Sequence, residues 1–176
     1  MDTLVPLAAL SAGEAGRHLA GLGELLHACV HDGASVGFVL PYTQADAEAF
    51  WAEKVFPAVQ AGTRTLLAAH IDGRIAGTVQ LDCDTPPNQP QRAEVRKLLV
   101  HPRHRRQGLG RALMLELEQR ARMAQRRLLT LDTRTGDHAE PLYAALGYQR
   151  AGVIPGFCLD VARQRYDATT IMYKLL

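Results

Sequence analysis

Glycines and arginines are concentrated in one short stretch, VRKLLVHPRHRRQGLGRALMLELE, which spans residues 95–118. An apolar run typical of a strand ends at Pro102, and a helical apolar pattern begins at Gly108-Leu109-Gly110. The start of a helix presents unpaired backbone N–H groups and the positive end of its dipole, and glycine lets the backbone approach a phosphate. The stretch therefore predicts an anion site. Four arginines add positive charge there: Arg103, Arg105, Arg106 and Arg111.

The same stretch is also compatible with an ordinary turn bearing solvated arginines, or with a different phosphate motif. No lysine follows the glycines as a Walker loop requires, and Leu113 stands where a dinucleotide fingerprint has its third glycine. Nucleic-acid binding through the arginines is a rival that would weaken steeply with salt. Because the net charge is only +2 and no aromatic interleaving or helix-turn-helix pattern is present, we expect no nucleic-acid partner.

Length and composition indicate one globular domain over residues 1–176, with 47% hydrophobic and 22% charged residues. Cys29, Cys83 and Cys158 are far apart and lack metal-ligand spacing, so we expect free thiols in a reducing compartment and no metal. The first residues lack a basic start, and no apolar stretch approaches the roughly 18 residues of a membrane span. We therefore expect a cytoplasmic protein without a membrane partner.

The order of periodic segments predicts helices that alternate with strands. Two strand-like runs flank the hairpin signal Asp72-Gly73. A mixed sheet covered by helices is the expected fold class, α/β. Strands are predicted over residues 3–10, 63–84 as a hairpin, 93–100, 127–135, 150–159 and 168–176, and helices over 14–31, 43–62 with Thr43 as N-cap, 109–125 and 137–148.

Three segments together resemble the GNAT superfamily of acetyl-CoA-dependent N-acetyltransferases. RRQGLG, residues 105–110, matches the signature R/Q-x-x-G-x-G/A; AEVRKLLVHPRHR before it resembles the family's fourth strand, and PLYAALGYQRAG after it the LYxxxGF element. The resemblance covers residues 65–176 well, and residues 128–160 are similar to the tabtoxin-resistance acetyltransferases. It implies a GNAT-like mixed, mostly antiparallel twisted sheet of about six to seven strands flanked by about four helices.

The resemblance also implies where the cosubstrate acetyl-CoA binds. Backbone amides over residues 106–111 would hold the pyrophosphate, and Leu98 and Val100 would pair with the pantetheine arm like an added strand. An N–H near Leu98 or Leu99 would polarise the thioester carbonyl. Gly136 departs from the family pattern, because many members carry a coenzyme-contacting asparagine there. The expected coenzyme-binding residues are Leu98, Leu99, Val100, Arg105, Arg106, Gln107, Gly108, Leu109, Gly110 and Arg111.

Two carboxylates are candidates for accepting the proton that an amine, with a pKa of about 10, must lose before it attacks. Strand alternation places Glu94 on the same face as Leu98 and Val100, beside the thioester. The alternative for Glu94 is a surface carboxylate paired with Arg92. Asp132 ends the run LLTLD, and it would share the base role, bind the substrate ammonium, or cap the end of the strand.

Tyr143 is the expected proton donor to the leaving thiolate, and its alternative role is a core aromatic on an amphipathic helix. Tyr148 fills the family's aromatic position after glycine and is expected to be structural. No cysteine is placed as an acyl carrier, which favours direct attack in a ternary complex. Phe38, Tyr42, Trp51 and Phe157 are candidates for lining an acceptor pocket, although core packing is favoured for each.

The predicted reaction moves acetyl from acetyl-CoA to a primary amine. A small molecule is the expected partner: an amino acid, an amine or an amine-bearing toxin. A protein lysine or N-terminus is the second choice, and a non-catalytic acyl-CoA-binding module is the rival from another class. The sequence also leaves open a homodimer.

Overall fold

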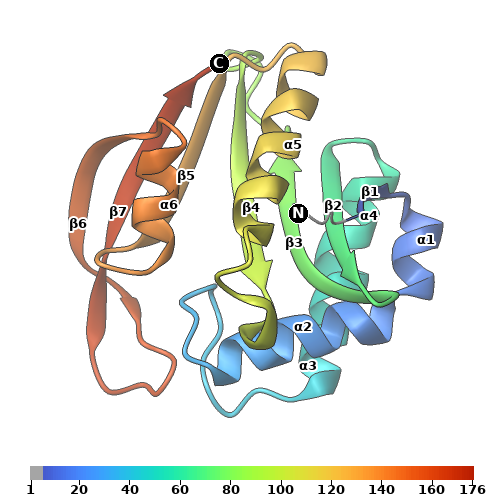
Figure 1. The fold of residues 1–176 in the computed structure, drawn as a ribbon. Helices are drawn as coiled ribbons and strands as arrows, with labels where there is room; N and C mark the ends of the chain where they lie inside the picture. Colours follow the sequence, from blue (N-terminus) through green and yellow to red (C-terminus); the bar gives the residue numbers. More distant parts are fainter. Residues whose placement is uncertain (1–5) are drawn as a thin grey trace.

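The computed structural model describes residues 6–176, which form one seven-stranded sheet in the order β1-β2-β3-β4-β5-β7-β6 (Figure 1). Every neighbouring pair is antiparallel except β4 and β5, which are parallel. This confirms the predicted mixed, mostly antiparallel α/β fold; residues 3–5 of the first predicted strand lie outside the described residues. The strands are β1 (Leu7–Leu10), β2 (Arg64–Ile71), β3 (Arg74–Asp82), β4 (Arg92–Val100), β5 (Leu128–Arg134), β6 (Gln149–Leu159) and β7 (Tyr166–Leu175).

The helices of the N-terminal half are more divided than the sequence indicates. The segment predicted over 14–31 breaks at His18, and the segment over 43–62 contains a π-helical turn, Trp51–Val55, directly before the α-helical turn that holds Pro57. Proline has no N–H to donate to the preceding turn, which accounts for the altered pattern there. Thr43 is the predicted N-cap, and its hydroxyl accepts from the amide of Asp46 at 3.1 Å.

The α-helices are α1 (Ala12–Arg17), α2 (Leu19–His31), α3 (Gln44–Phe50), α4 (Phe56–Gln60), α5 (Leu109–Met123) and α6 (Ala139–Ala145), and Pro102–His104 form a 3-10 turn. Within residues 6–176, none of these helices combines the length and apolar character that crossing a membrane would require.

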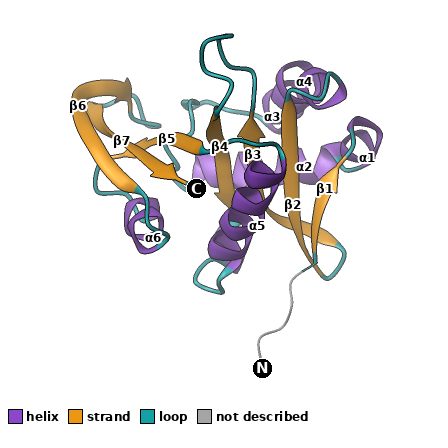
Figure 2. Ribbon diagram, turned by 90° about the horizontal axis from the view of Figure 1, so that it is seen from above, coloured by secondary structure: helices purple, strands orange, loops and turns teal. Residues whose placement is uncertain are grey.

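The helices lie on both faces of the sheet (Figure 2). On one side, here called the α5 face, α5 and α6 cover a core that includes Leu113 and Leu129. On the other, the α2 face, α2 and the segment from α3 to α4 cover a second core around Leu26 and Trp51. Both faces of the sheet are therefore covered. A gap between two of its strands would connect the α5 face with the α2 face.

Candidate functional site

A cleft opens in the sheet where β4 and β5 separate. The two strands pair only over Arg92–Glu94 and Leu128–Thr130, and beyond that point they diverge (Figure 1). A cavity of about 620 Å³ lies along this opening; it is lined by both strands, by the loop of residues 33–37 after α2, by the starts of α5 and α6, and by residues 157–158 of β6. From Val95 onward, the backbone of β4 therefore has no strand partner on its β5 side within the described part of the chain.

The second half of β4 begins with a bulge at Lys97, which has a positive φ of 49°. Before the bulge Arg96 pairs with Gln80, and after it Leu99 pairs with Thr78, so one extra residue is inserted in β4. An inserted residue reverses which side chains face which side of the sheet. The regular alternation assumed from the sequence ends here.

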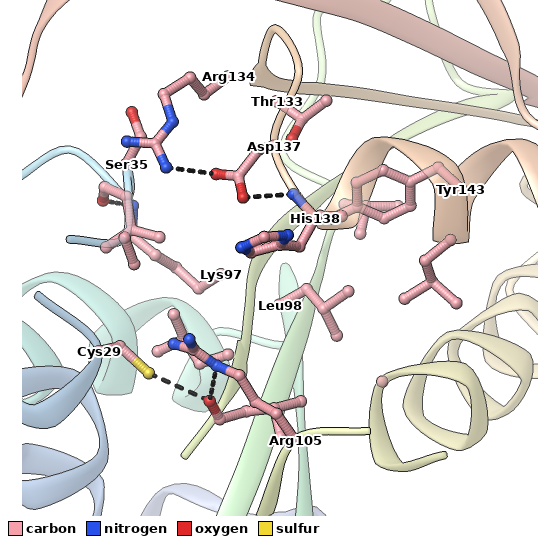
Figure 3. A pocket seen from close by; sticks show the side chains of 18 of the residues that line it. Cys29, Ser35, Lys97, Leu98, Arg105, Thr133, Arg134, Asp137, His138 and Tyr143 are labelled. Atoms are coloured by element: carbon pink, nitrogen blue, oxygen red, sulfur yellow. Dashed lines mark hydrogen bonds and ion pairs between the residues drawn. The ribbon is translucent and has the colours of Figure 1, made fainter. Parts of the chain in front are cut away.

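The bulge corrects the prediction for Glu94. Leu98 and Val100 pack against the core of the α5 face, whereas Leu99 belongs to the core of the α2 face. With the bulge between them, Glu94 lies on the α2 face, so the prediction that it shares a face with Leu98 and Val100 is wrong. Figure 3 shows the two residues that follow this change, with the side chain of Lys97 directed toward the loop of residues 33–37 and that of Leu98 directed away from it.

The turn before α5 has the conformation that its glycine suggested. Gly108 is the N-cap residue with a φ of 83°, no side chain caps the helix, and Arg106 also has a positive φ of 63°. A Cβ on Gly108 would touch nothing within 4 Å, so glycine is needed there for its backbone conformation. Gly110 differs, because its Cβ would lie 3.2 Å from Leu142 Cδ2 of α6. Gly108 thus gives the turn before α5 its conformation, and Gly110 lets α5 and α6 approach each other.

The predicted coenzyme residues are placed around the cavity, with two qualifications. The carbonyl of Val100 already accepts from Arg105 Nε at 3.4 Å and from Cys29 Sγ at 3.5 Å, while Arg105 also pairs with Asp32 at the end of α2. Gln107 is exposed and is absent from the cavity lining. The others also line the cavity: Leu98, Leu99, Arg106, Gly108, Leu109, Gly110 and Arg111.

The two candidate carboxylates both line the cavity but differ in their partners. Glu94 is held by Arg96 at 3.1 Å and lies 4.0 Å from Arg92, so the expected surface pairing is present as well. Asp132 is exposed and, among residues 6–176, accepts a side-chain hydrogen bond only from the hydroxyl of Thr169, at 3.1 Å. Because β5 continues to residue 134, the interpretation of Asp132 as a strand-end cap is wrong.

Tyr143 lies on α6 and belongs to both the core and the cavity wall. Its ring centroid lies 5.8 Å from that of Tyr148, which is buried in the core, as its predicted structural role requires. Burial raises the pKa of Tyr143, and the nearby carboxylates of Asp132 and Asp137 raise it further. The phenol therefore keeps its proton at neutral pH.

Arg134 and Lys97 line the cavity although no role in the site was predicted for either of them from the sequence. Arg134 joins Asp137 at 3.1 Å and the carbonyl of Gly33 at 3.1 Å, which ties β5 to the loop after α2 (Figure 3). Lys97 also enters the cavity. Phe157, a candidate for lining an acceptor pocket, lines the cavity and is 51% exposed, so the favoured alternative of core packing is wrong for it. No motif marks these residues, because they come together only through the fold.

A family model described as the acetyltransferase (GNAT) family matches residues 30–148, more than half of the chain. The chain belongs to this family. GNAT acetyltransferases use acetyl-CoA as cosubstrate, and the open edge of β4 beside the uncapped start of α5 fits such a ligand.

Solved structures share this fold over nearly the whole chain. yncA from Salmonella typhimurium, solved with its cofactor acetyl-CoA, is 18% identical with a TM-score of 0.78, and the match covers 99% of this chain and 95% of that one. A ribosomal-protein-alanine N-acetyltransferase from Brucella melitensis is 20% identical with a TM-score of 0.76, over 98% and 100%. An N-acetyltransferase from Staphylococcus aureus Mu50 is 14% identical with a TM-score of 0.80, over 98% and 99%.

Proposed function

We propose that residues 1–176 act as one domain that transfers acetyl from acetyl-CoA to a primary amine of a small molecule. One observation carries this proposal: a single cavity is lined both by the start of α5, where the anion site is predicted, and by the carboxylates of Glu94 and Asp132. A donor can enter from one side and an acceptor from the other.

The donor side is built mainly from backbone. The free amides at the start of α5, from Gly108 to Arg111, would hold the pyrophosphate, with Arg106 and Arg111 adding charge. Leu98 and Leu99 lie where the edge of β4 is open, and they would bind the pantetheine arm and polarise the carbonyl. Acetyl-CoA supplies the activated acetyl thioester when bound.

The acceptor side supplies the proton transfers. Asp132, which has few partners, would take the proton from the amine, with Glu94 assisting or acting through water. Tyr143 would donate its proton to the departing thiolate. Burial raises the pKa of Cys29 to about 11, so this lining thiol stays protonated. That supports direct attack in a ternary complex rather than an acyl-cysteine route.

A small-molecule acceptor is favoured over a protein acceptor because charged groups line the inside of the cavity. Lys97 and the Arg134–Asp137 pair would meet a small ligand. A protein lysine or N-terminus is the alternative, and the similar Brucella melitensis protein is named for a protein acceptor. The non-catalytic acyl-CoA-binding module would need neither Asp132 nor Tyr143. The finer likeness to the tabtoxin-resistance enzymes also belongs to this proposal.

We further propose a homodimer and a cytoplasmic location. β6 is an edge strand with almost every residue exposed, including Val153, Ile154 and Phe157. An exposed apolar edge of this kind can pair with a second copy about a two-fold axis, and light scattering would give the mass in solution. The three cysteines are free, as a reducing compartment allows.

The test of the proposed function is release of coenzyme A thiol from acetyl-CoA with a panel of small amines and peptides. The proposal expects amine-dependent thiol release that saturates with a small amine and falls in Asp132→Asn. Release with peptides alone would select the protein-acceptor alternative. Acetyl-CoA binding without transfer to any acceptor would select the non-catalytic module.

A further inference from the structure

The side chain of Lys97 crosses the α2-face end of the cavity toward the loop of residues 33–37 (Figure 3). Its Nζ donates to the carbonyl of Val36 at 2.6 Å and lies 5.3 and 5.5 Å from the ring centroids of Phe38 and Phe50. No carboxylate oxygen of the described residues lies within 4.0 Å of this ammonium. An ammonium has three donors, and among the described residues only the Val36 carbonyl accepts a hydrogen bond from it.

The arginines that line the cavity differ from Lys97 in their location or in their partners. Arg106 and Arg111 belong to the start of α5, at the expected pyrophosphate end. The remaining three already have carboxylate partners: Arg96 with Glu94, Arg105 with Asp32, and Arg134 with Asp137. Among the described lysines and arginines that line the acceptor end, Lys97 alone has no carboxylate partner.

Burying this ammonium disfavours its charge. Burial, with help from Arg96, lowers the pKa of Lys97 to about 8, although Asp132 and Glu94 oppose the change. A methionine would pack against Phe38 and Phe50 without such a penalty. The contacts with Val36, Phe38 and Phe50 offset part of this cost, and a bound anion would offset more of it.

We propose that the acceptor is an amino acid, or another small amine that also carries a carboxylate, and that Lys97 binds this carboxylate. Asp132 and Glu94 line the same cavity and would face the amine, so the two charges of a zwitterion meet opposite charges of the protein. Lys97 is then a specificity-determining residue. This inference rests on the proposed function, and it names the acceptor class of the same site.

The experiment pairs each of a panel of L-amino acids with the amine that lacks its carboxylate, such as methionine with 3-(methylthio)propylamine. The readout is the ratio of kcat/KM for the acid to kcat/KM for the amine, from thiol release by the full chain. A hydrogen-bonded charge pair is worth about a 10- to 100-fold preference, which the wild type should show for at least one acid. Lys97→Met should bring that ratio toward one, mainly through KM for the acid.

Two further variants keep the test decisive. Lys54→Met removes an exposed lysine that does not line the cavity, and it should leave the ratio unchanged. Lys97→Arg keeps a cation and should retain more of the preference than Lys97→Met. Calorimetric binding of the preferred acid to the protein saturated with coenzyme A should follow the same order.

The outcomes separate the two levels of the proposal. Equal use of acids and amines by the wild type, or an unchanged ratio in Lys97→Met, would overturn the carboxylate inference while leaving the acetyltransferase proposal in place. The absence of thiol release with every acceptor would overturn the proposed function itself, and the carboxylate inference with it.

Discussion

The two ends of the cavity are built from different parts of the chain. At the α5 end, backbone conformation dominates: a left-handed glycine, an uncapped helix start and an open strand edge. At the α2-face end, side chains from β4, β5 and the loop after α2 converge, among them Lys97, Asp132 and Arg134. A backbone site suits a ligand shared by a whole family, and a side-chain site suits an acceptor that differs between members.

The substitution expected to have the largest effect is Gly108→Val, which attacks the backbone end. A β-branched residue at a φ of 83° is strained, and the turn that presents the amides would change. We expect acetyl-CoA binding to weaken by about 100-fold or more, measured by calorimetry. Gly62→Val is a matched control, because Gly62 also has a positive φ of 74° with open space around it but lies outside the cavity.

The next largest effect separates the two carboxylates of the acceptor end. Asp132 has one hydroxyl partner, whereas Glu94 is neutralised by Arg96. Asp132→Asn should lower kcat/KM by about 100-fold, within the usual range for a general base. Glu94→Gln should lower it by only about 10-fold. A larger loss in Glu94→Gln would reverse the assignment of the base.

Tyr143→Phe tests the predicted proton donor to the leaving thiolate, which lines the same cavity. Loss of the proton donor should reduce kcat by about 10- to 100-fold while acetyl-CoA affinity stays near that of the wild type. Tyr148→Phe is the matched control, because Tyr148 packs beside Tyr143 but does not line the cavity. Normal turnover in Tyr143→Phe would leave Tyr143 with a packing role alone.

The smallest expected effect is a pH dependence of acceptor preference. Lys97, with its pKa lowered to about 8 by burial, binds a carboxylate below that pH and loses its charge above it. Asp132 and Glu94 favour its charged form, and Arg96 and Arg64 oppose it. The acid-to-amine ratio of kcat/KM should therefore fall between pH 7 and 9, by up to about 10-fold.

This decline concerns the ratio of the two kcat/KM values, and the individual rates should rise with pH. Deprotonation of the acceptor amines raises both rates in this pH range, and the slightly lower pKa of the amino acid's ammonium leaves a small drift in their ratio. Lys97→Met should show this drift alone, without the larger decline of the wild type. A wild-type ratio that follows the Lys97→Met profile from pH 7 to 9 would count against a titrating lysine in the acceptor site.

The donor end could be predicted from the sequence because it is local. A strand, a glycine turn and a helix start within residues 95–118 determine both the conformation and the charge of the anion site. The strands could be predicted for the same reason, since each is a short strand-like run between turn or loop residues. Gln107, by contrast, belongs to the motif but does not line the cavity.

The acceptor end could not be predicted, because it depends on pairing between strands. The bulge gives Lys97 a positive φ, and no residue type in the segment RKLLV predicts such a conformation. Regular alternation without this bulge puts Glu94 on the wrong face of the sheet and gives Lys97 no role in the site. The contact of Arg134 with the carbonyl of Gly33 joins residues about a hundred positions apart, which only the folded chain reveals.

The central claim is that a backbone-built donor site is separate from a side-chain-built acceptor site. Its most direct test is calorimetric titration with acetyl-CoA of three proteins: the wild type, Gly108→Val and Lys97→Met. We predict that the wild type and Lys97→Met bind with similar affinity and that Gly108→Val loses most of its binding. Binding that survives in Gly108→Val, or that disappears in Lys97→Met, would contradict a backbone-built donor site separate from a side-chain-built acceptor site.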